Sequence, residues 1–119
     1  MDTRKLMTAT GAGLVAQLAM VVAGHFIPVI KEHGFAIGGV LISLLTGVLY
    51  VRLSRAGWAN ALIGGAIAGG VCALLGIAVS FALGDVPMSI LLLGTVGSAV
   101  GGLVGGAIGR ALPGSAATP

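Results

Sequence analysis

The charged side chains of this 119-residue chain are few, and their spacing leaves four long uncharged runs. Six are basic and three are acidic, and they are Asp2, Arg4, Lys5, Lys31, Glu32, Arg52, Arg55, Asp85 and Arg110. The runs between them cover residues 6–30, 33–51, 56–84 and 86–109. A helix needs roughly 20 apolar residues to cross the hydrocarbon core of a bilayer, so each run is long enough to cross once. We therefore expect transmembrane helices at 9–30, 35–53, 59–83 and 88–109.

The overall composition argues against the other fold classes. Charged residues make up 8% of the chain, whereas about 25% is usual in soluble domains. With 57% hydrophobic residues, a soluble fold would expose a large apolar surface, and a disordered chain would be far more polar. The apolar runs are continuous and lack the alternation of barrel strands. The sequence predicts an all-α polytopic membrane protein, with a glycine-rich, tightly packed four-helix domain over 1–110 and a short flexible cytoplasmic tail over 111–119.

The basic residues predict the orientation of these helices in the membrane. In a four-span arrangement, five basic residues fall on one side and only Lys31 falls on the other. Loops rich in lysine and arginine stay in the cytoplasm. We therefore expect both termini in the cytoplasm, with the loops around Lys31 and Asp85 on the outer side.

Glycine and other small residues form rows along the expected helices. On 88–109 the rows are Gly94, Ser98, Gly102, Gly106 and, beside it, Gly97, Gly101, Gly105, Gly109. The helix at 59–83 has Gly65 and Gly69 in such a row, the helix at 35–53 has Gly39, Ser43 and Gly47, and the helix at 9–30 has Ala12, Gly13, Ala16, Ala19 and Ala23. Small residues spaced four apart let helix backbones approach closely in a membrane. We expect these rows to be contact faces, either between the helices at 59–83 and 88–109 or across a subunit interface.

Few polar side chains lie inside the spans. Gln17 and His25 are eight residues apart and can share one side of a helix, and Ser43 and Thr95 lie on two other spans. One interpretation is that Gln17, His25, Ser43 and Thr95 border a polar path or contact a ligand. The other is that Gln17 makes an ordinary interhelical hydrogen bond and His25 lies at the outer membrane interface.

The sequence gives no pattern for catalysis or for a cofactor. The middle of every span lacks Asp, Glu, Lys and Arg, which argues against transport coupled to protons or cations. Glu32, His33, Asp85 and His25 could gather on the outer side, but their spacing matches no metal-binding pattern. Cys72 is the single cysteine and is interpreted as a small apolar filler. We expect no enzyme activity, no catalytic residue, no cofactor and no metal.

The paired-glycine stretches at 64–70 and 101–106 loosely resemble those of small bacterial inner-membrane proteins such as the transglycosylase-associated group. The resemblance covers only these stretches, implies a location in the bacterial inner (plasma) membrane and assigns no role to any residue.

Two functions are expected from these observations. The first is a non-enzymatic membrane protein that acts through helix packing, as a homo-oligomer or as an accessory subunit of a larger membrane complex. The alternative is a small channel or an uncoupled transporter for an ion or small solute, with its path near Gln17, Ser43 and Thr95. The net charge of +3 reflects the membrane topology and gives no reason to expect nucleic acid as a partner.

Overall fold

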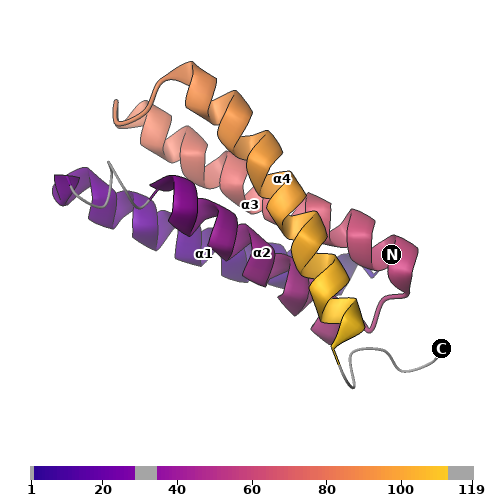
Figure 1. Cartoon of the computed structure of the whole chain (residues 1–119). Coiled ribbons are helices and arrows are strands. Elements are labelled where there is room, and N and C mark those ends of the chain that lie inside the picture. Colours follow the sequence, from indigo (N-terminus) through magenta and orange to yellow (C-terminus); the bar gives the residue numbers. More distant parts are fainter. Residues whose placement is uncertain (1, 29–34, 113–119) are drawn as a thin grey trace.

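The computed structural model describes residues 2–28 and 35–112, and within them the chain forms four long helices (Figure 1). They are α1 (Thr3–Phe26), α2 (Phe35–Ser54), α3 (Trp58–Ala82) and α4 (Met88–Ala111). The expected all-helical fold is confirmed, and all four helices are long and apolar enough to cross a membrane. At 1.5 Å per residue, helices of 20 to 25 residues are about 30 to 37 Å long.

The first helix begins six residues earlier than its apolar run predicts. Asp2 is the N-cap of α1, and its side chain accepts a hydrogen bond from the backbone N–H of Lys5 at 3.1 Å. The basic residues Arg4 and Lys5 are therefore part of the helix. A hydrophobic run marks the part of a helix that can enter a bilayer, whereas a capping side chain decides where the helix begins.

The other predicted boundaries agree with the structure to within about two residues, except that α1 ends at Phe26 and not at residue 30. Ala111, predicted to start the tail, is the last residue of α4. Residues 113–119 and the loop containing Lys31, Glu32 and His33 lie outside the described residues.

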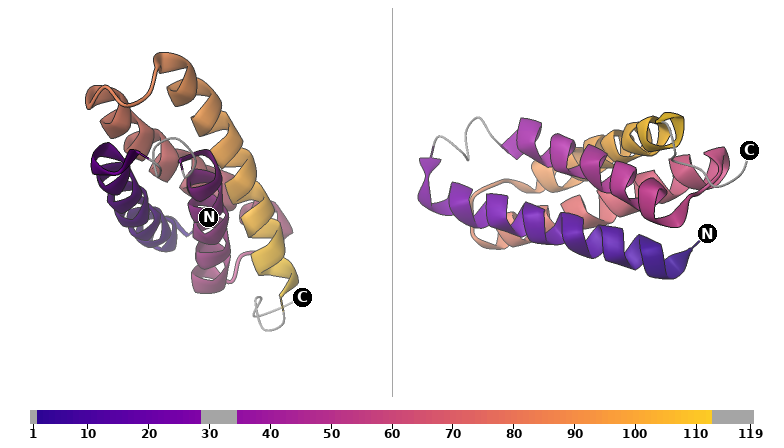
Figure 2. Two further views of the ribbon diagram at one scale, coloured as in Figure 1. Left: turned by 60° about the vertical axis from the view of Figure 1, so that its left-hand side comes forward. Right: turned by 90° about the horizontal axis from the view of Figure 1, so that it is seen from below.

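The four helices form an elongated bundle of 46 × 20 × 20 Å. Each of α2 and α3 contacts the three other helices, whereas no described residues of α1 and α4 come into contact. Helices α1 and α4 therefore lie on opposite sides of the α2–α3 pair (Figure 2).

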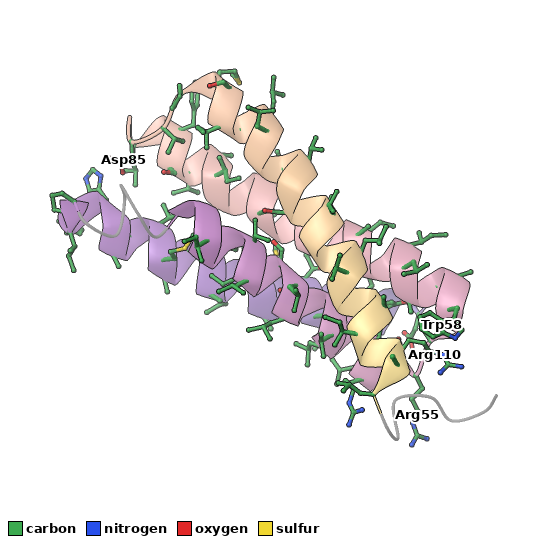
Figure 3. All side chains as sticks on the ribbon, in the orientation of Figure 1. Arg55, Trp58, Asp85 and Arg110 are labelled. Atoms are coloured by element: carbon green, nitrogen blue, oxygen red, sulfur yellow. The ribbon has the colours of Figure 1, made fainter. Side chains whose placement is uncertain are left out.

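The start of α1 and the end of α4 lie at the same end of the bundle (Figures 1 and 2). We call this the arginine end, because Arg55 and Arg110 lie there, beside Trp58 (Figure 3). The loop between α3 and α4 lies at the opposite end, which we call the Asp85 end (Figure 3). The α3–α4 hairpin diverges from α1 and α2 towards the Asp85 end (Figure 1).

The two glycine rows of α4 contact two different helices. The row of Gly102 and Gly106 meets α3: a Cβ added at Gly102 would collide with the backbone of Gly65, and one at Gly106 would collide with Ala61. The row of Gly101, Gly105 and Gly109 meets α2 at Val40, Leu44 and Val48. Because adjacent i, i+4 rows point in different directions on one helix, α4 can sit in the groove between α2 and α3.

Three helices meet at one point in this groove. A Cβ added at Gly69 would lie 2.8 Å from the Cα of Gly102 and 3.1 Å from the carbonyl oxygen of Ser43. Gly47 of α2 also lies directly against the carbonyl group of Gly102. We call the set Gly47, Gly65, Gly69 and Gly102 the glycine contact. The small rows of α3 and α4 are thus used within one chain, while bulky residues such as Ile63, Ile67, Val96 and Val100 cover the outside.

Helix α1 buries a different face from the one its alanines suggest. Its buried residues are Ala9, Gly13, Gln17, Val21 and Gly24, which follow one another along one side of the helix. Ala12, Ala16 and Ala19 are exposed on the outside of the bundle. Only Gly13, among the small residues expected to pack, faces the interior, where a Cβ would meet Thr46 and lie 3.1 Å from the sulfur of Cys72. The alanine row of the first helix is therefore not an internal contact face.

Candidate functional site

Gln17 is the centre of a buried group of polar side chains. Its side-chain Nε2 donates to the carbonyl oxygen of Gly39 at 3.2 Å and to Ser43 Oγ at 3.3 Å, and it lies 3.9 Å from Cys72 Sγ. Because a carbonyl group can only accept, the contact with Gly39 determines which side of the amide is the NH₂ group. The Gln17 side chain is 1% exposed, so these bonds replace water for a group that would otherwise be costly to bury.

The hydrogen bonds continue from Gln17 across α2 to α3. Ser43 Oγ donates to the carbonyl oxygen of Gly69 at 3.0 Å, and Cys72 Sγ donates to the same oxygen at 3.3 Å. Thr46 donates to the carbonyl oxygen of Ile42, four residues earlier, at 2.7 Å. We call Gln17, Ser43, Thr46 and Cys72 the polar cluster. It ties α1, α2 and α3 together close to the glycine contact.

A cavity of about 450 Å³ extends from the Asp85 end to Gln17 and Ser98, near the middle of their helices. All four helices and the α3–α4 loop contribute to its walls, through Gln17, Met20, Val21, Gly39, Val40, Ile77, Ser80, Asp85, Val86, Ile90, Leu93, Gly94, Gly97 and Ser98. Most of these residues are apolar, with a few polar groups among them. Cavities of this size and composition are typical of binding sites for small molecules.

The turn that ends α3 places Asp85 in the wall of this cavity. Gly84 has φ +78°, a conformation that glycine adopts without strain. Its N–H bonds to the carbonyl of Phe81, and the N–H of Asp85 bonds to the carbonyl of Ser80, each at 3.0 Å. This pair of bonds is a Schellman motif, which closes the last turn of a helix. The Asp85 side chain, 7% exposed, then pairs with His25 Nδ1 at 2.8 Å.

The pair of His25 and Asp85 connects the ends of α1 and α3. The His25 side chain is 36% exposed, and its ring packs edge-to-face on Phe26 with 5.0 Å between the ring centroids. His25 is therefore at the edge of the bundle, eight residues and about two helical turns from Gln17. It does not line the cavity, although its partner Asp85 does.

Ser80 lines the cavity and is not hydrogen-bonded to the protein. The residue is 2% exposed, and its Oγ has no hydrogen-bond partner among the described residues. Serine in a helix often bonds to the carbonyl four residues earlier, and both Thr46 and Thr95 do so here. A buried hydroxyl without a partner costs about 1–3 kcal/mol. Ser80 is therefore a polar group that the protein buries without satisfying it.

The half of the bundle towards the arginine end is filled by side chains. Tyr50, Val51, Ala56, Ala61 and Ala9 are buried there in one cluster. The ring of Tyr50 lies directly against Gly64 of α3. At the surface of this end, the guanidinium of Arg110 lies 5.3 Å from the ring centroid of Trp58, within range of a cation–π interaction. The cavity lies between the middle of the bundle and the Asp85 end, and none of its lining residues belongs to this buried cluster.

The structure brings together two of the four residues expected to border a polar path. Gln17 and Ser43 are bonded to each other, and Gln17 borders the cavity. Thr95 is separate, since it does not line the cavity and its hydroxyl bonds at 2.6 Å to the carbonyl of Leu91 on its own helix. No group of three or more potential metal ligands is present among the described residues, and Glu32 and His33 lie outside them.

Ser80 and Asp85 were not among the site residues expected from the sequence. Ser80 continues a row of small residues, Cys72, Gly76 and Ser80, each four positions after the last, and this row could have indicated that its hydroxyl faces inward. The sequence allows Asp85 to gather with His25 on the outer side, and the structure pairs the two, but the place of Asp85 in the cavity wall depends on the turn at Gly84.

Comparison with known proteins supplies no relative for this arrangement. No family model, no curated protein sequence and no solved structure matches the chain.

Proposed function

We propose that this chain is a non-enzymatic, multi-pass membrane protein that binds a small, mainly apolar molecule inside its helix bundle. The observation that carries the proposal is the cavity of about 450 Å³, lined by residues of all four helices and bordered by the buried side chains of Gln17, Ser80 and Ser98. An apolar wall with a few polar groups is how proteins hold small organic molecules.

The charges support an orientation for this protein in the bacterial inner membrane. Arg55 and Arg110 lie at the arginine end, and Asp85 lies at the other (Figure 3). Under the positive-inside rule the arginine end faces the cytoplasm and the cavity lies in the outer half of the bundle. Alkaline phosphatase fused after Ala111 should be inactive and the same enzyme inserted after Asp85 should be active. The reverse pattern would contradict this orientation.

The geometry favours binding over an open channel. A channel requires a continuous path, whereas here Tyr50 and its neighbours fill the bundle beyond the polar cluster. Any passage of the bound molecule would therefore require the helices at the arginine end to separate.

Binding can be tested with a substitution that places a new side chain in the cavity, at a position where there is room for it. Gly97 lines the cavity, and a Cβ added there meets no atom within 4 Å, so Gly97→Leu should occupy the cavity without separating the helices. Gly11 gives a matched control, since a Cβ there also meets nothing within 4 Å but the residue lies on the exposed side of α1.

The probe is radiolabelled 1-adamantanol, a compact cage-shaped alcohol, added to the protein in lipid nanodiscs, with empty nanodiscs correcting for uptake by lipid. We expect saturable binding of one molecule per chain for the unaltered protein and for Gly11→Leu, and none for Gly97→Leu. Equal binding by both variants would show that the probe binds elsewhere and would refute the proposed site.

A second candidate function is self-association, or assembly with another membrane protein, through α1. It is supported by one observation: α1 exposes Ala12, Ala16 and Ala19 and contacts only α2 and α3. Small residues on an outer face would allow a further helix to approach closely. If this face is used, Ala16→Leu should reduce the mass of the detergent-solubilised particle measured by light scattering, whereas Val71→Leu on the exposed side of α3 should not. An unchanged mass for Ala16→Leu would exclude this interface.

A further inference from the structure

The cavity presents hydrogen-bond acceptors near its inner end. All three side-chain amide contacts of Gln17 use Nε2, and no described residue donates to its Oε1. An amide oxygen has two lone pairs and can only accept. Because Gln17 borders the cavity, a molecule that enters and carries an O–H or N–H group can supply the missing donor.

Ser80 provides a second polar atom in the wall. Its hydroxyl is buried and has no partner among the described residues, so it can accept one bond and donate another. Buried polar groups in folded proteins almost always have a partner. The hydroxyls of Tyr50 and Ser54 are also buried without a partner among the described residues, but of these three hydroxyls only that of Ser80 belongs to the cavity wall, where a bound molecule can supply the partner.

The electrostatics of the wall oppose an anion. Asp85 is the one charged residue among the described residues that line the cavity, and it is acidic. Asp85 is paired with His25, and no Lys or Arg of the described chain borders the space. A carboxylate or phosphate group would meet the amide oxygen of Gln17 and the carboxyl group of Asp85, and the hydroxyls of Ser80 and Ser98 are the neutral donors left to replace its hydration without a cationic partner.

The other residues of the cavity wall are mainly apolar and suit the hydrocarbon part of a ligand. The aliphatic side chains of the wall come from every helix and from the α3–α4 loop, and they are Met20, Val21, Val40, Ile77, Val86, Ile90 and Leu93. Gly97 adds no side chain on the α4 side, and a Cβ there would meet no atom within 4 Å, so the cavity keeps its width at this position. Burial of a ligand's hydrocarbon surface against these residues would stabilise a ligand that enters from water.

We propose that the ligand of this cavity is a compact apolar molecule with a single hydrogen-bond-donating head group, a hydroxyl or an amine, that bonds to Gln17 Oε1 and Ser80 Oγ. This inference rests on the proposed binding function and assigns the chemical class of the ligand. A molecule of the same shape with a carboxylate head is rejected.

The experiment compares three probes that share one cage: 1-adamantanol, 1-adamantanamine and 1-adamantanecarboxylate. Each competes with radiolabelled 1-adamantanol for the protein in nanodiscs made of zwitterionic lipid, so that membrane charge does not favour either ion. We expect the alcohol and the amine to compete and the carboxylate to be at least about tenfold weaker, the difference that corresponds to about 1.4 kcal/mol. Equal competition by all three would overturn the assigned class while leaving the proposed binding function in place. Absence of any saturable binding would overturn both.

Ser80→Ala then tests the contact in the wall. Removing one hydrogen-bonding group should weaken binding of the alcohol by about fivefold. The same change should leave the melting temperature of the ligand-free protein unchanged or higher, because the hydroxyl has no partner to lose. Thr95→Val is the matched control, since this hydroxyl bonds to its own helix and lies outside the cavity, and it should leave binding unchanged. Equal binding by Ser80→Ala and the unaltered protein, or a clear loss of stability without ligand, would contradict the role of Ser80.

Discussion

Gly102→Ala is the smallest change that should separate the helices of this bundle. The added Cβ would collide with the carbonyl oxygen of Gly65 and would lie 3.0 Å from its carbonyl carbon and from the Cα of Gly69. All of these atoms belong to the backbone of α3, so no side chain can rotate away. Since carbon atoms prefer separations of about 3.5–4.0 Å, α3 would have to move by roughly 1 Å.

The magnitude follows from two opposing effects. Overfilling a packed contact costs about 1–3 kcal/mol, and a collision with rigid backbone belongs at the upper end of that range. Replacing glycine by alanine within a helix also stabilises the folded state by about 1 kcal/mol, because alanine has the higher helix propensity. We therefore expect Gly102→Ala to lower the free energy of unfolding by about 2 kcal/mol. Gly97→Ala, on the same helix, has room for its Cβ and should raise that free energy by up to about 1 kcal/mol.

The assay is reversible unfolding in mixed micelles of dodecylmaltoside and increasing dodecyl sulfate, followed by far-ultraviolet circular dichroism. The two variants should differ by about 3 kcal/mol, which is a factor of roughly 10² in the unfolding equilibrium. If both variants unfold at the same dodecyl sulfate content, α4 does not pack on Gly65 and Gly69 and the reasoning fails.

Three further predictions concern the polar cluster, the cysteine and the arginine end. Combining Gln17→Leu with Ser43→Ala in a double-mutant cycle should give a coupling energy of about 0.6–1.7 kcal/mol, as for other hydrogen bonds between membrane helices, and a value of zero would show that the bond at 3.3 Å is not formed. Cys72 is fully buried and should react with a maleimide only after unfolding in dodecyl sulfate, so rapid reaction of the native protein would contradict its position. The single tryptophan, Trp58, should change its fluorescence emission in Arg110→Gln and keep it more nearly in Arg110→Lys, whereas identical spectra for all three proteins would exclude the contact at 5.3 Å.

The number and class of the helices could be predicted from the sequence because both depend on local properties. An uncharged run of sufficient length specifies a helix that can cross a membrane, wherever its neighbours lie. The start of α1 could not be predicted in this way, because the capping bond of Asp2 extends the helix into charged residues. The arrangement of the site could not be predicted from local sequence. Asp85 lies in the cavity wall because of the Schellman turn, and no spacing in the sequence relates it to Gln17 or Ser80.

The rotation of α1 shows how one residue can outweigh a row of small ones. The alanines at 12, 16 and 19 would favour one face for packing, yet the buried face contains Gln17. Turning the alanines inward would point the amide of Gln17 away from Gly39 and Ser43 and leave it without partners in an apolar surrounding. The cost of an unpaired amide, about 1–3 kcal/mol or more, is larger than the gain from closer backbone approach. The sequence contains both the alanine row and Gln17, and the positions of Gly39 and Ser43 in the fold decide which of them faces inward.

Each buried donor of the chain of bonds from Gln17 to Gly69 finds its acceptor on the next helix along the sequence, so the donors and acceptors are synthesised in that order. Gln17 enters with the first helix, and its acceptors Gly39 and Ser43 arrive with the second. Ser43 in turn receives its acceptor, Gly69, with the third helix. Only then does the fourth helix bring Gly102 to Gly47, Gly65 and Gly69. If the helices are inserted in this order, each new helix would supply the acceptor for the buried polar group of the helix before it, and the last helix, which takes part in none of these bonds, would complete the bundle through the packing of its glycines.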